Sequence, residues 1–225
     1  MLSDISLFEG LSFAEVAFVY ASVFFGFFVR GAFGFGSNMP IVLLITWVLG
    51  PHHTIILVAV TAAYSQLTLL PQGPRHADWK VVGALVPGTA IGIAASIWLL
   101  LRIEASGLMA IMGGLVLVIV IMDRFRVIDT LSRSLDLRSL PISTGMAMAS
   151  GALGTLSGGG GIYFLAGYLK HACPSPAVFR CTNIMVGGAF MGIRFVSLSV
   201  AGLIVFEYML EAALLVPVIF AGTWA

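Results

Sequence analysis

Residues 31–40 read GAFGFGSNMP and residues 154–163 read GTLSGGGGIY, two glycine-rich stretches that interrupt otherwise apolar sequence. Each has an apolar segment on both sides. A glycine run at membrane depth leaves backbone N–H and C=O groups free, and these are tolerated there only where they face protein or line a cavity that a solute enters. The two stretches, called here the first and second glycine breaks, therefore predict a membrane carrier whose substrate is held where two broken helices meet.

The composition of the chain excludes an ordinary soluble domain. Of its 225 residues, 60% are hydrophobic and 9% are charged, whereas globular proteins carry about 25% charged residues. A transmembrane helix needs roughly 20 apolar residues, and four runs without Asp, Glu, Lys or Arg suit this requirement. They cover residues 31–74, 81–101, 105–122 and 139–169. We therefore expect an all-α polytopic protein in a lipid bilayer. The net charge of +1 gives no electrostatic signal for nucleic acid.

Neither the N-terminus nor the cysteines indicate processing or metal binding. The first ten residues, MLSDISLFEG, are acidic where a signal peptide would be basic, so the first helix should be retained. Cys173 and Cys181 have no neighbouring His–Cys pattern, which makes a metal pair a weak hypothesis. We expect them to be small packing residues near a membrane surface.

Apolar segments and helix breakers predict five helices in the first repeat, residues 1–122. They cover about residues 13–33, 38–49, 52–70, 79–101 and 105–122. The second, ended by Gly50-Pro51, would span only about 20 Å of a hydrocarbon core of about 30 Å, so its crossing is left open. The charged stretch 123–139 is expected to be a cytoplasmic linker. A second transmembrane repeat follows in residues 140–225.

The two halves share spaced motifs. Gly158 follows Gly34 by 124 positions inside matching glycine breaks, and LVPVIFAG at 215–222 follows LVPGTAIG at 85–92 by 130 positions. Internal repeats are a common plan for secondary transporters, and an odd number of crossings per half would make them inverted repeats. Because the first half continues to residue 122 after Gly92, the repeat also predicts a further helix beyond Ala225.

The distribution of Lys and Arg predicts the orientation. If all five segments of each half cross, with the N-terminus outside, nine basic residues lie inside and only Arg102 and Arg194 lie outside. If the short segments after the breaks are re-entrant, the better split is seven to four. The positive-inside rule favours the first arrangement. The nine residues are Arg30, Arg75, Lys80, Arg124, Arg126, Arg133, Arg138, Lys170 and Arg180.

The glycine breaks are the predicted substrate-binding site. Helix N-termini expose four N–H donors and carry about half a positive charge, and a short helix that starts after a break aims these donors at the cavity. With the polar side chains beside them, the breaks form a concave set of neutral donors suited to an oxyanion. Close helix packing is the alternative explanation for the glycines. The predicted site residues are Gly34, Gly36, Ser37, Asn38, Ser157, Gly158, Gly159 and Gly160.

Arginines within the apolar sequence are further candidates. Arg180 begins a helix, with Asn183 one turn on, and would either supply a fixed charge to the anion or anchor the helix at the interface. Arg194 has no charged neighbour in sequence before Glu207, so it should face a cavity or lie near the surface. Arg30, beside the first break, is the third candidate.

Acids and histidines are scarce. Glu207 and Glu211 lie one helical turn apart and could share a proton; Glu211 is the better candidate for coupling transport to protons, and an interfacial position is the alternative. His52 and His53 follow Gly50-Pro51 and are expected to anchor a helix at the interface rather than bind metal. We predict no cofactor, no metal and no catalytic residue, because no phosphate-binding loop or catalytic grouping is visible.

Several short motifs, in their order and spacing, resemble the sulfite exporter TauE/SafE family of bacterial membrane permeases. The chain departs from the family where Ile162 and Tyr163 stand in a region that often holds a proline, and the family usually extends beyond residue 225. The resemblance implies export or uptake of a small sulfur-containing anion, such as sulfite or an organosulfonate, across the bacterial inner membrane, coupled to an ion gradient. The matching motifs are GAFGFG at 31–36, Gly50-Pro51, Asp78-Trp79, LVPGTAIG at 85–92, SGGGG at 157–161, Tyr168-Leu169, FRCT at 179–182 and LVP at 215–217.

The sequence thus predicts a secondary transporter and not an enzyme. A permease for another small carboxylate or inorganic anion is one alternative. An integral-membrane enzyme acting on a lipid or phosphate is another, but it would need convergent acids, histidines or a metal within the membrane, and here the acids lie mostly in loops or at helix ends. The expected partners are a small anionic substrate and the bilayer, with a homodimer left open.

Overall fold

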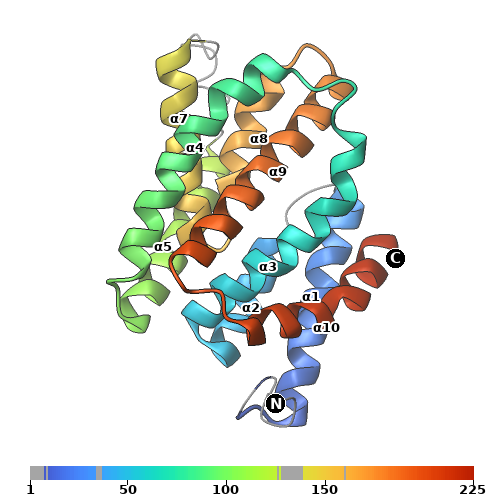
Figure 1. The fold of residues 1–225 in the computed structure, drawn as a ribbon, viewed down its shortest axis with the longest axis vertical. Coiled ribbons are helices and arrows are strands. Elements are labelled where there is room, and N and C mark those ends of the chain that lie inside the picture. Colours follow the sequence, from blue (N-terminus) through green and yellow to red (C-terminus); the bar gives the residue numbers. More distant parts are fainter. Residues whose placement is uncertain (1–7, 9, 34–36, 126, 128–138, 160) are drawn as a thin grey trace.

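The computed structural model shows a protein built from helices (Figure 1). It describes residues 8, 10–33, 37–125, 127, 139–159 and 161–225, and no strand occurs within them. Six helices of this described part are long and apolar enough to cross a membrane, which confirms the all-α polytopic fold class. The elements are α1 (Phe13–Phe33), α2 (Asn38–Leu49), α3 (Pro51–Leu69), the 3-10 turn η1 (Leu70–Gln72), α4 (Trp79–Leu100), α5 (Ala105–Arg124), α7 (Leu140–Leu156), α8 (Gly161–Ala172), α9 (Pro176–Val200) and α10 (Phe206–Trp224).

Breaker and capping residues set the helix ends. Gly50, with a φ of 77°, separates α2 from α3, and proline begins α3, where no N–H is needed. The carboxylate of Asp78 caps α4 by accepting hydrogen bonds from the backbone N–H groups of Lys80 and Val81, at 3.1 and 3.3 Å. Ser175 caps α9 in the same way. The five helices predicted for the first repeat are confirmed, with ends that differ by at most two residues.

Each glycine break turns the chain back on itself. Ile41 of α2 lies against Gly26 of α1, so α2 returns along the helix that precedes it. In the second half the hydroxyl of Ser150 in α7 donates a hydrogen bond of 2.5 Å to the carbonyl of Gly161, the first residue of α8. Both returning helices, α2 and α8, have 12 residues.

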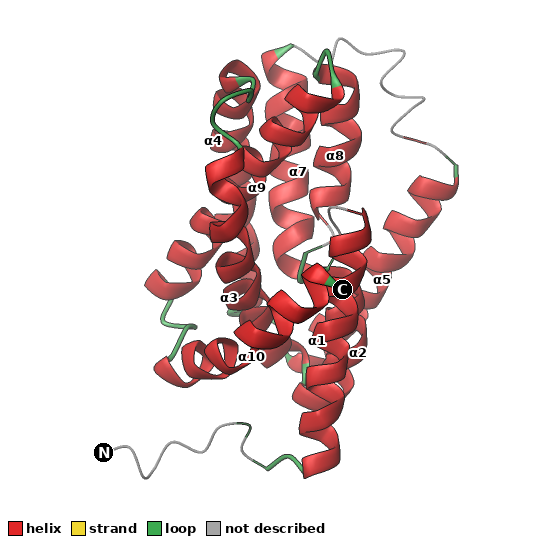
Figure 2. Ribbon diagram, turned by 90° about the vertical axis from the view of Figure 1, so that its right-hand side faces the viewer, coloured by secondary structure: helices red, strands yellow, loops and turns green. Residues whose placement is uncertain are grey.

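The helices form two groups that meet at α3 and α9. In Figures 1 and 2, α4, α7, α8 and α9 lie together in the upper part of the molecule, and α1, α2 and α10 lie together below. Corresponding helices of the two halves make corresponding contacts, since α4 packs on α7 and α9 as α10 packs on α1 and α3. This reciprocity favours a duplicated architecture, and the inverted repeat stays a prediction.

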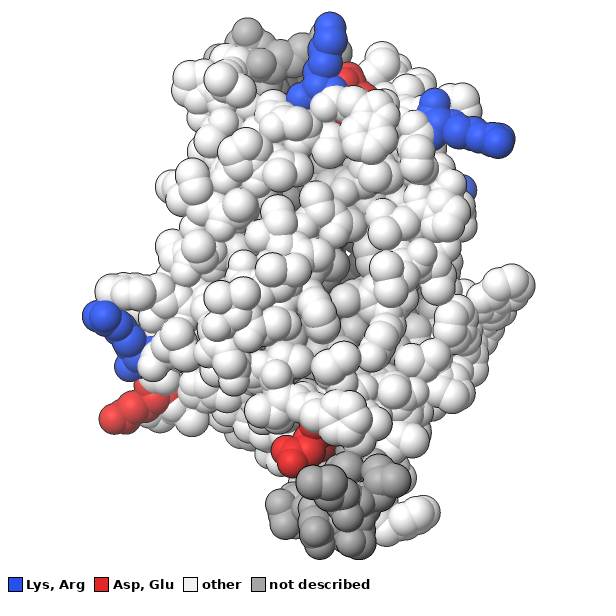
Figure 3. All heavy atoms as spheres, in the orientation of Figure 1, with Lys and Arg blue, Asp and Glu red and all other residues white. Residues whose placement is uncertain are grey.

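The outer surface is apolar. Large side chains such as Trp47, Leu117, Val196 and Phe206 are exposed, and Figure 3 shows a broad uncharged band between charged ends. Such a surface suits contact with lipid. The interior, in contrast, contains buried polar side chains on α3, α9 and at the breaks, among them Gln66, Arg194 and Asn38.

Candidate functional site

A cavity of about 550 Å³ lies between α1, α3, α9 and α10. Two arginines line it, and its described lining contains no Asp or Glu, so the cavity is positively charged. Four further lining residues carry hydroxyl or amide groups. The lining comprises Arg30, Gly31, Ala32, Ser65, Thr68, Leu69, Phe179, Arg180, Asn183, Ile184 and Thr223.

Arg30 is held in the cavity wall by a buried glutamine. It stands in the last turn of α1, and its Nη2 donates to Oε1 of Gln66 at 3.0 Å. The amide Nε2 of Gln66 in turn donates to the backbone carbonyl of Ile184 on α9, at 2.9 Å. Gln66 therefore links α1, α3 and α9. A guanidinium has five N–H donors, and the hydrogen bonds described for Arg30 use one of them, which leaves donors for a ligand.

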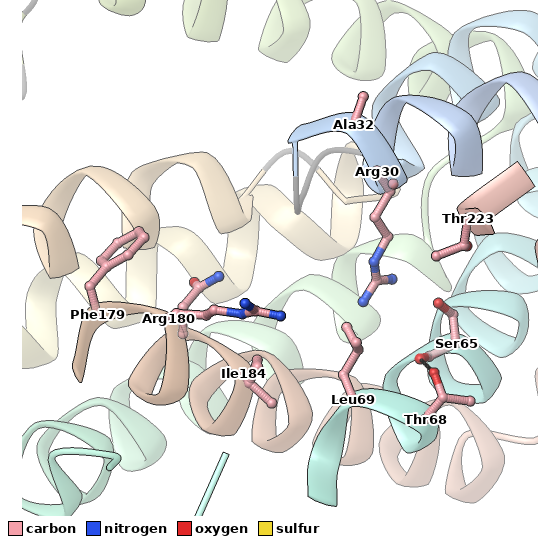
Figure 4. Close-up of a pocket in the computed structure, with 11 residues that line it drawn as sticks. Arg30, Ala32, Ser65, Thr68, Leu69, Phe179, Arg180, Ile184 and Thr223 are labelled. Atoms are coloured by element: carbon pink, nitrogen blue, oxygen red, sulfur yellow. Dashed lines mark hydrogen bonds between the residues drawn. The ribbon is translucent and has the colours of Figure 1, made fainter. Parts of the chain in front are cut away.

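Arg180 approaches the cavity from the opposite side. It lies near the start of α9, is exposed, and its Nη2 donates to Oε1 of Gln72 at 3.3 Å. Figure 4 shows the guanidinium groups of Arg30 and Arg180 projecting from α1 and α9 toward the same space. Asn183 lines this space one turn after Arg180. Two planar donor groups that converge on one cavity are suited to an oxyanion, which each can bind in a bidentate manner.

The two glycine breaks meet one another at a different place. Gly158 and Gly159 have φ values of 74° and 152°, and a methyl group on Gly159 would contact the Cβ and Nδ2 atoms of Asn38. Ser37, Asn38 and Ser157 are buried. Gly34, Gly36 and Gly160 lie outside the described residues. The predicted substrate-binding residues therefore fall into two places. Arg180 and Asn183 line the cavity, together with Gly31 and Ala32 of the first break. The other described residues of the breaks are not part of the cavity lining.

Arg194 joins the second break to α3. The sequence left open whether Arg194 lies in the interior or near the surface. Its side chain is 0% exposed, so it lies in the interior. Nη2 donates to the backbone carbonyl of Ile55 at 3.1 Å, and Nη1 lies 3.5 Å from the carbonyl oxygen of Gly158. Among the described residues, its Nε has no hydrogen-bond partner.

His53, in the first turn of α3, forms a pair of ionisable side chains with Glu211 of α10. Nε2 of His53 lies 2.6 Å from Oε2 of Glu211, and Oε1 of Glu211 accepts a hydrogen bond from the backbone N–H of Phe8 at 3.0 Å. The His53 ring also packs edge-on against Tyr208, with 4.7 Å between ring centroids. Glu207 is exposed. The predicted sharing of a proton between the two glutamates is therefore replaced by a pairing of Glu211 with His53, which had been interpreted only as an interfacial anchor.

Gln66 and the His53–Glu211 pair were not identified from the sequence. Gln66 is the one carboxamide within α3, and a lone amide in an apolar helix was an available signal. The histidine pairing had no local signal, because its partners are 158 positions apart. Within the described residues, no group of three or more His, Cys, Asp or Glu side chains is arranged to hold a metal ion.

Comparison with known protein families identifies the architecture around this cavity. Searches among curated proteins and among solved structures gave no match. A family model described as sulfite exporter TauE/SafE matches residues 19–225, which include the cavity, both glycine breaks and the His53–Glu211 pair. The match covers nearly the whole chain, and we conclude that the protein belongs to the TauE/SafE family of sulfite exporters.

Proposed function

We propose that the protein is a permease that moves a small sulfur-containing anion, such as sulfite or an organosulfonate, through the Arg30–Arg180 cavity. Its family is a family of multi-pass membrane transporters and not of enzymes. The observation that carries the proposal is the convergence of two arginines on one cavity whose described lining holds no acid. The alternative function of an integral-membrane enzyme is wrong, because the family consists of transporters.

The chemistry of the lining supports an oxyanion with one or two charges. Arg30 and Arg180 supply charge and paired donors, and Ser65, Thr68 and Asn183 add neutral donors around them. Hydrogen bonds to charged groups contribute about 1.5–3 kcal/mol each. A volume of about 550 Å³ falls within the usual range of small-molecule sites, which is roughly 300–1,000 Å³. The space therefore admits sulfite with water, or a larger organosulfonate.

The distribution of charge supports access to the cavity from the cytoplasm of a bacterial cell. The α3–α4 turn, with Arg75 and Lys80, and the α8–α9 turn, beside Arg180, both lie at the upper end of the molecule in Figure 1. The α4–α5 and α9–α10 turns lie in the lower half; the first contains one basic residue, Arg102, and the second contains none. Under the positive-inside rule the upper end is cytoplasmic, and an anion captured there is positioned for export.

A flux assay in proteoliposomes tests this function. Vesicles containing the purified protein are loaded with radiolabelled sulfite, and efflux is followed with and without a pH gradient. We expect saturable efflux that unlabelled organosulfonates inhibit, and none in protein-free vesicles or in the double variant Arg30→Gln/Arg180→Gln. Efflux of a carboxylate in place of sulfite would assign the protein another substrate. Absence of flux for every anion in a folded, reconstituted protein would contradict the proposal.

A further inference from the structure

One face of α9 connects the cavity to the buried arginine. Arg180, Gly187 and Arg194 are spaced by seven residues, and seven residues are close to two turns of a helix with 3.6 residues per turn, so all three lie on one face. At ~1.5 Å per residue, Arg194 lies about 21 Å along the helix from Arg180. Gly187, midway, faces Gln66: a methyl group there would lie 3.4 Å from the Gln66 amide nitrogen. The glutamine that holds Arg30 therefore stands between the two arginines.

Arg194 is a buried charge that has no acidic partner among the described residues. The buried carboxyl group of Glu211 contacts His53, and both hydrogen bonds of Arg194 go to neutral backbone carbonyls. Its Nε has no partner among the described residues. Buried charges in proteins are normally paired. A buried guanidinium whose Nε and charge have no partner in the described part of the chain has the properties of a ligand-binding group in an anion carrier.

The surroundings of Arg194 also favour an anion. The carbonyl that faces its Nη1 belongs to Gly158, and the next residue, Gly159, packs against Asn38, the first residue of α2. The N-cap position of α2, Ser37, makes no side-chain cap hydrogen bond in the described structure. The positive end of the α2 dipole therefore lies where the two glycine breaks meet, and the guanidinium contacts the second of these breaks.

We propose that Arg194 and the N-terminus of α2 form a second, inner anion-binding site, which the anion reaches from the cavity along the α9 face past Gln66. The ligand is the transported oxyanion, so the inference rests on the proposed function. Gly158 and Gly159 of the second break let the first turns of α2 approach closely, because a side chain on either glycine would collide with Val42 or Asn38. Gln66, which bridges Arg30 to the Ile184 carbonyl, separates the two sites until an anion on Arg30 competes for its hydrogen bond.

A purely structural role for Arg194 makes a different prediction. In that role Arg194 would only join α3 to the second break through its hydrogen bonds to the two backbone carbonyls. Its charge would then have no effect on transport. Lysine and glutamine separate the two roles, because both can donate to a carbonyl but only lysine keeps the charge. Arg102 provides a control, since it is exposed in the α4–α5 turn and stacks on Trp98, with its Cζ 4.0 Å from the ring centroid.

The experiment measures radiolabelled sulfite binding in detergent, sulfite flux in proteoliposomes and thermal unfolding for wild type, Arg194→Lys, Arg194→Gln and Arg102→Gln. We expect Arg194→Gln to fold and to bind sulfite in the Arg30–Arg180 cavity, while its flux falls by roughly 10- to 100-fold through the loss of a charge-assisted contact. Arg194→Lys should keep most of the flux, and Arg102→Gln should match wild type.

The opposite results have distinct meanings. Equal flux in Arg194→Gln and wild type, an equal loss in the lysine and glutamine variants, or misfolding of both would each assign Arg194 to a structural role and overturn the inner site alone. If wild-type protein neither binds nor moves sulfite, sulfonate or carboxylate, the proposed function is wrong and the inner site falls with it.

Discussion

Gly222 of α10 lies directly against the backbone of Phe24 in α1, so that a methyl group on Gly222 would approach the Phe24 carbonyl oxygen to 2.6 Å. Gly92 of α4 has the same relationship to the carbonyl oxygen of Met148 in α7. Gly222 follows Gly92 by 130 positions and Met148 follows Phe24 by 124, the two offsets that the sequence motifs show. Two equivalent contacts, each joining a helix of one half to a helix of the other, thus support the predicted duplication.

Substitution of these glycines should destabilise the protein. Gly92→Ala and Gly222→Ala each place a methyl group on a backbone oxygen, and overpacking of this kind costs about 1–3 kcal/mol. Thermal unfolding in detergent measures the effect. The matched control is Gly83→Ala, which lies in α4 with nothing within 4 Å of the added carbon and should be neutral or slightly stabilising. Equal stability of all four proteins would show that the two contacts carry no packing role.

The local parts of the fold were predictable because their causes are local. Gly50, Pro51 and Asp78 act on neighbouring residues, and the helix ends that they determine were read correctly from the sequence. The long-range contacts were not. Gln66 reaches the Ile184 carbonyl across 118 positions, and His53 reaches Glu211 across 158. A single sequence contains no signal for such pairs, so the division between the cavity and the meeting point of the two breaks could not be foreseen.

Arg180 should bind substrate rather than only orient the protein. Arg180→Lys retains the charge but loses the planar fork, so we expect weaker sulfite binding with normal insertion, and a larger loss in Arg180→Gln. Equilibrium binding to purified protein measures both. Arg75→Gln removes a basic residue from the same end of the molecule without touching the cavity and should bind normally. Unchanged binding in both Arg180 variants would leave this residue with a topological role.

Gln66 should control how Arg30 presents its donors. Gln66→Glu keeps the shape but replaces the amide that donates to Ile184 with a carboxylate facing Arg30. The new carboxylate would compete with the substrate, so we expect sulfite affinity to fall by roughly 10-fold, in keeping with the strength of one charge-assisted hydrogen bond. Leu67→Ala, an exposed position on the same helix, is the control. Normal affinity in Gln66→Glu would exclude a role for Arg30 in binding.

Polar side chains at the breaks separate a binding role from close packing. Ser37→Ala, Asn38→Ala and Ser157→Ala remove polar groups without adding volume. If the breaks contact the anion, flux should fall by roughly 10-fold or more in folded protein, since a hydrogen bond to a charged ligand contributes about 1.5–3 kcal/mol. Gly159→Val is not informative by itself, because its side chain would collide with Asn38 whatever the function. Normal flux in all three alanine variants would assign the breaks to packing.

Glu211 is the residue through which a proton gradient should act on transport. Its carboxylate is buried and lies 2.6 Å from Nε2 of His53, so a proton can pass between the two side chains, and the backbone N–H of Phe8 fixes the other oxygen. Glu211→Gln keeps the shape and can retain both contacts, but it cannot release or accept a proton. We therefore expect the variant to lose sulfite flux driven by a pH gradient. Exchange of labelled for unlabelled sulfite needs no net movement of protons and should continue.

Glu207 supplies the matched control for this prediction. It lies one turn before Glu211 on α10, carries the same carboxyl group and is exposed, so Glu207→Gln should preserve gradient-driven flux as well as exchange. The decisive quantity is the ratio of gradient-driven flux to exchange in each protein, because poor reconstitution lowers both rates together and leaves their ratio unchanged. A wild-type ratio in Glu211→Gln would remove Glu211 from the coupling pathway. A low ratio confined to Glu211→Gln, and reproduced when His53 is replaced by Gln, would identify the pair as the proton-binding element of the carrier.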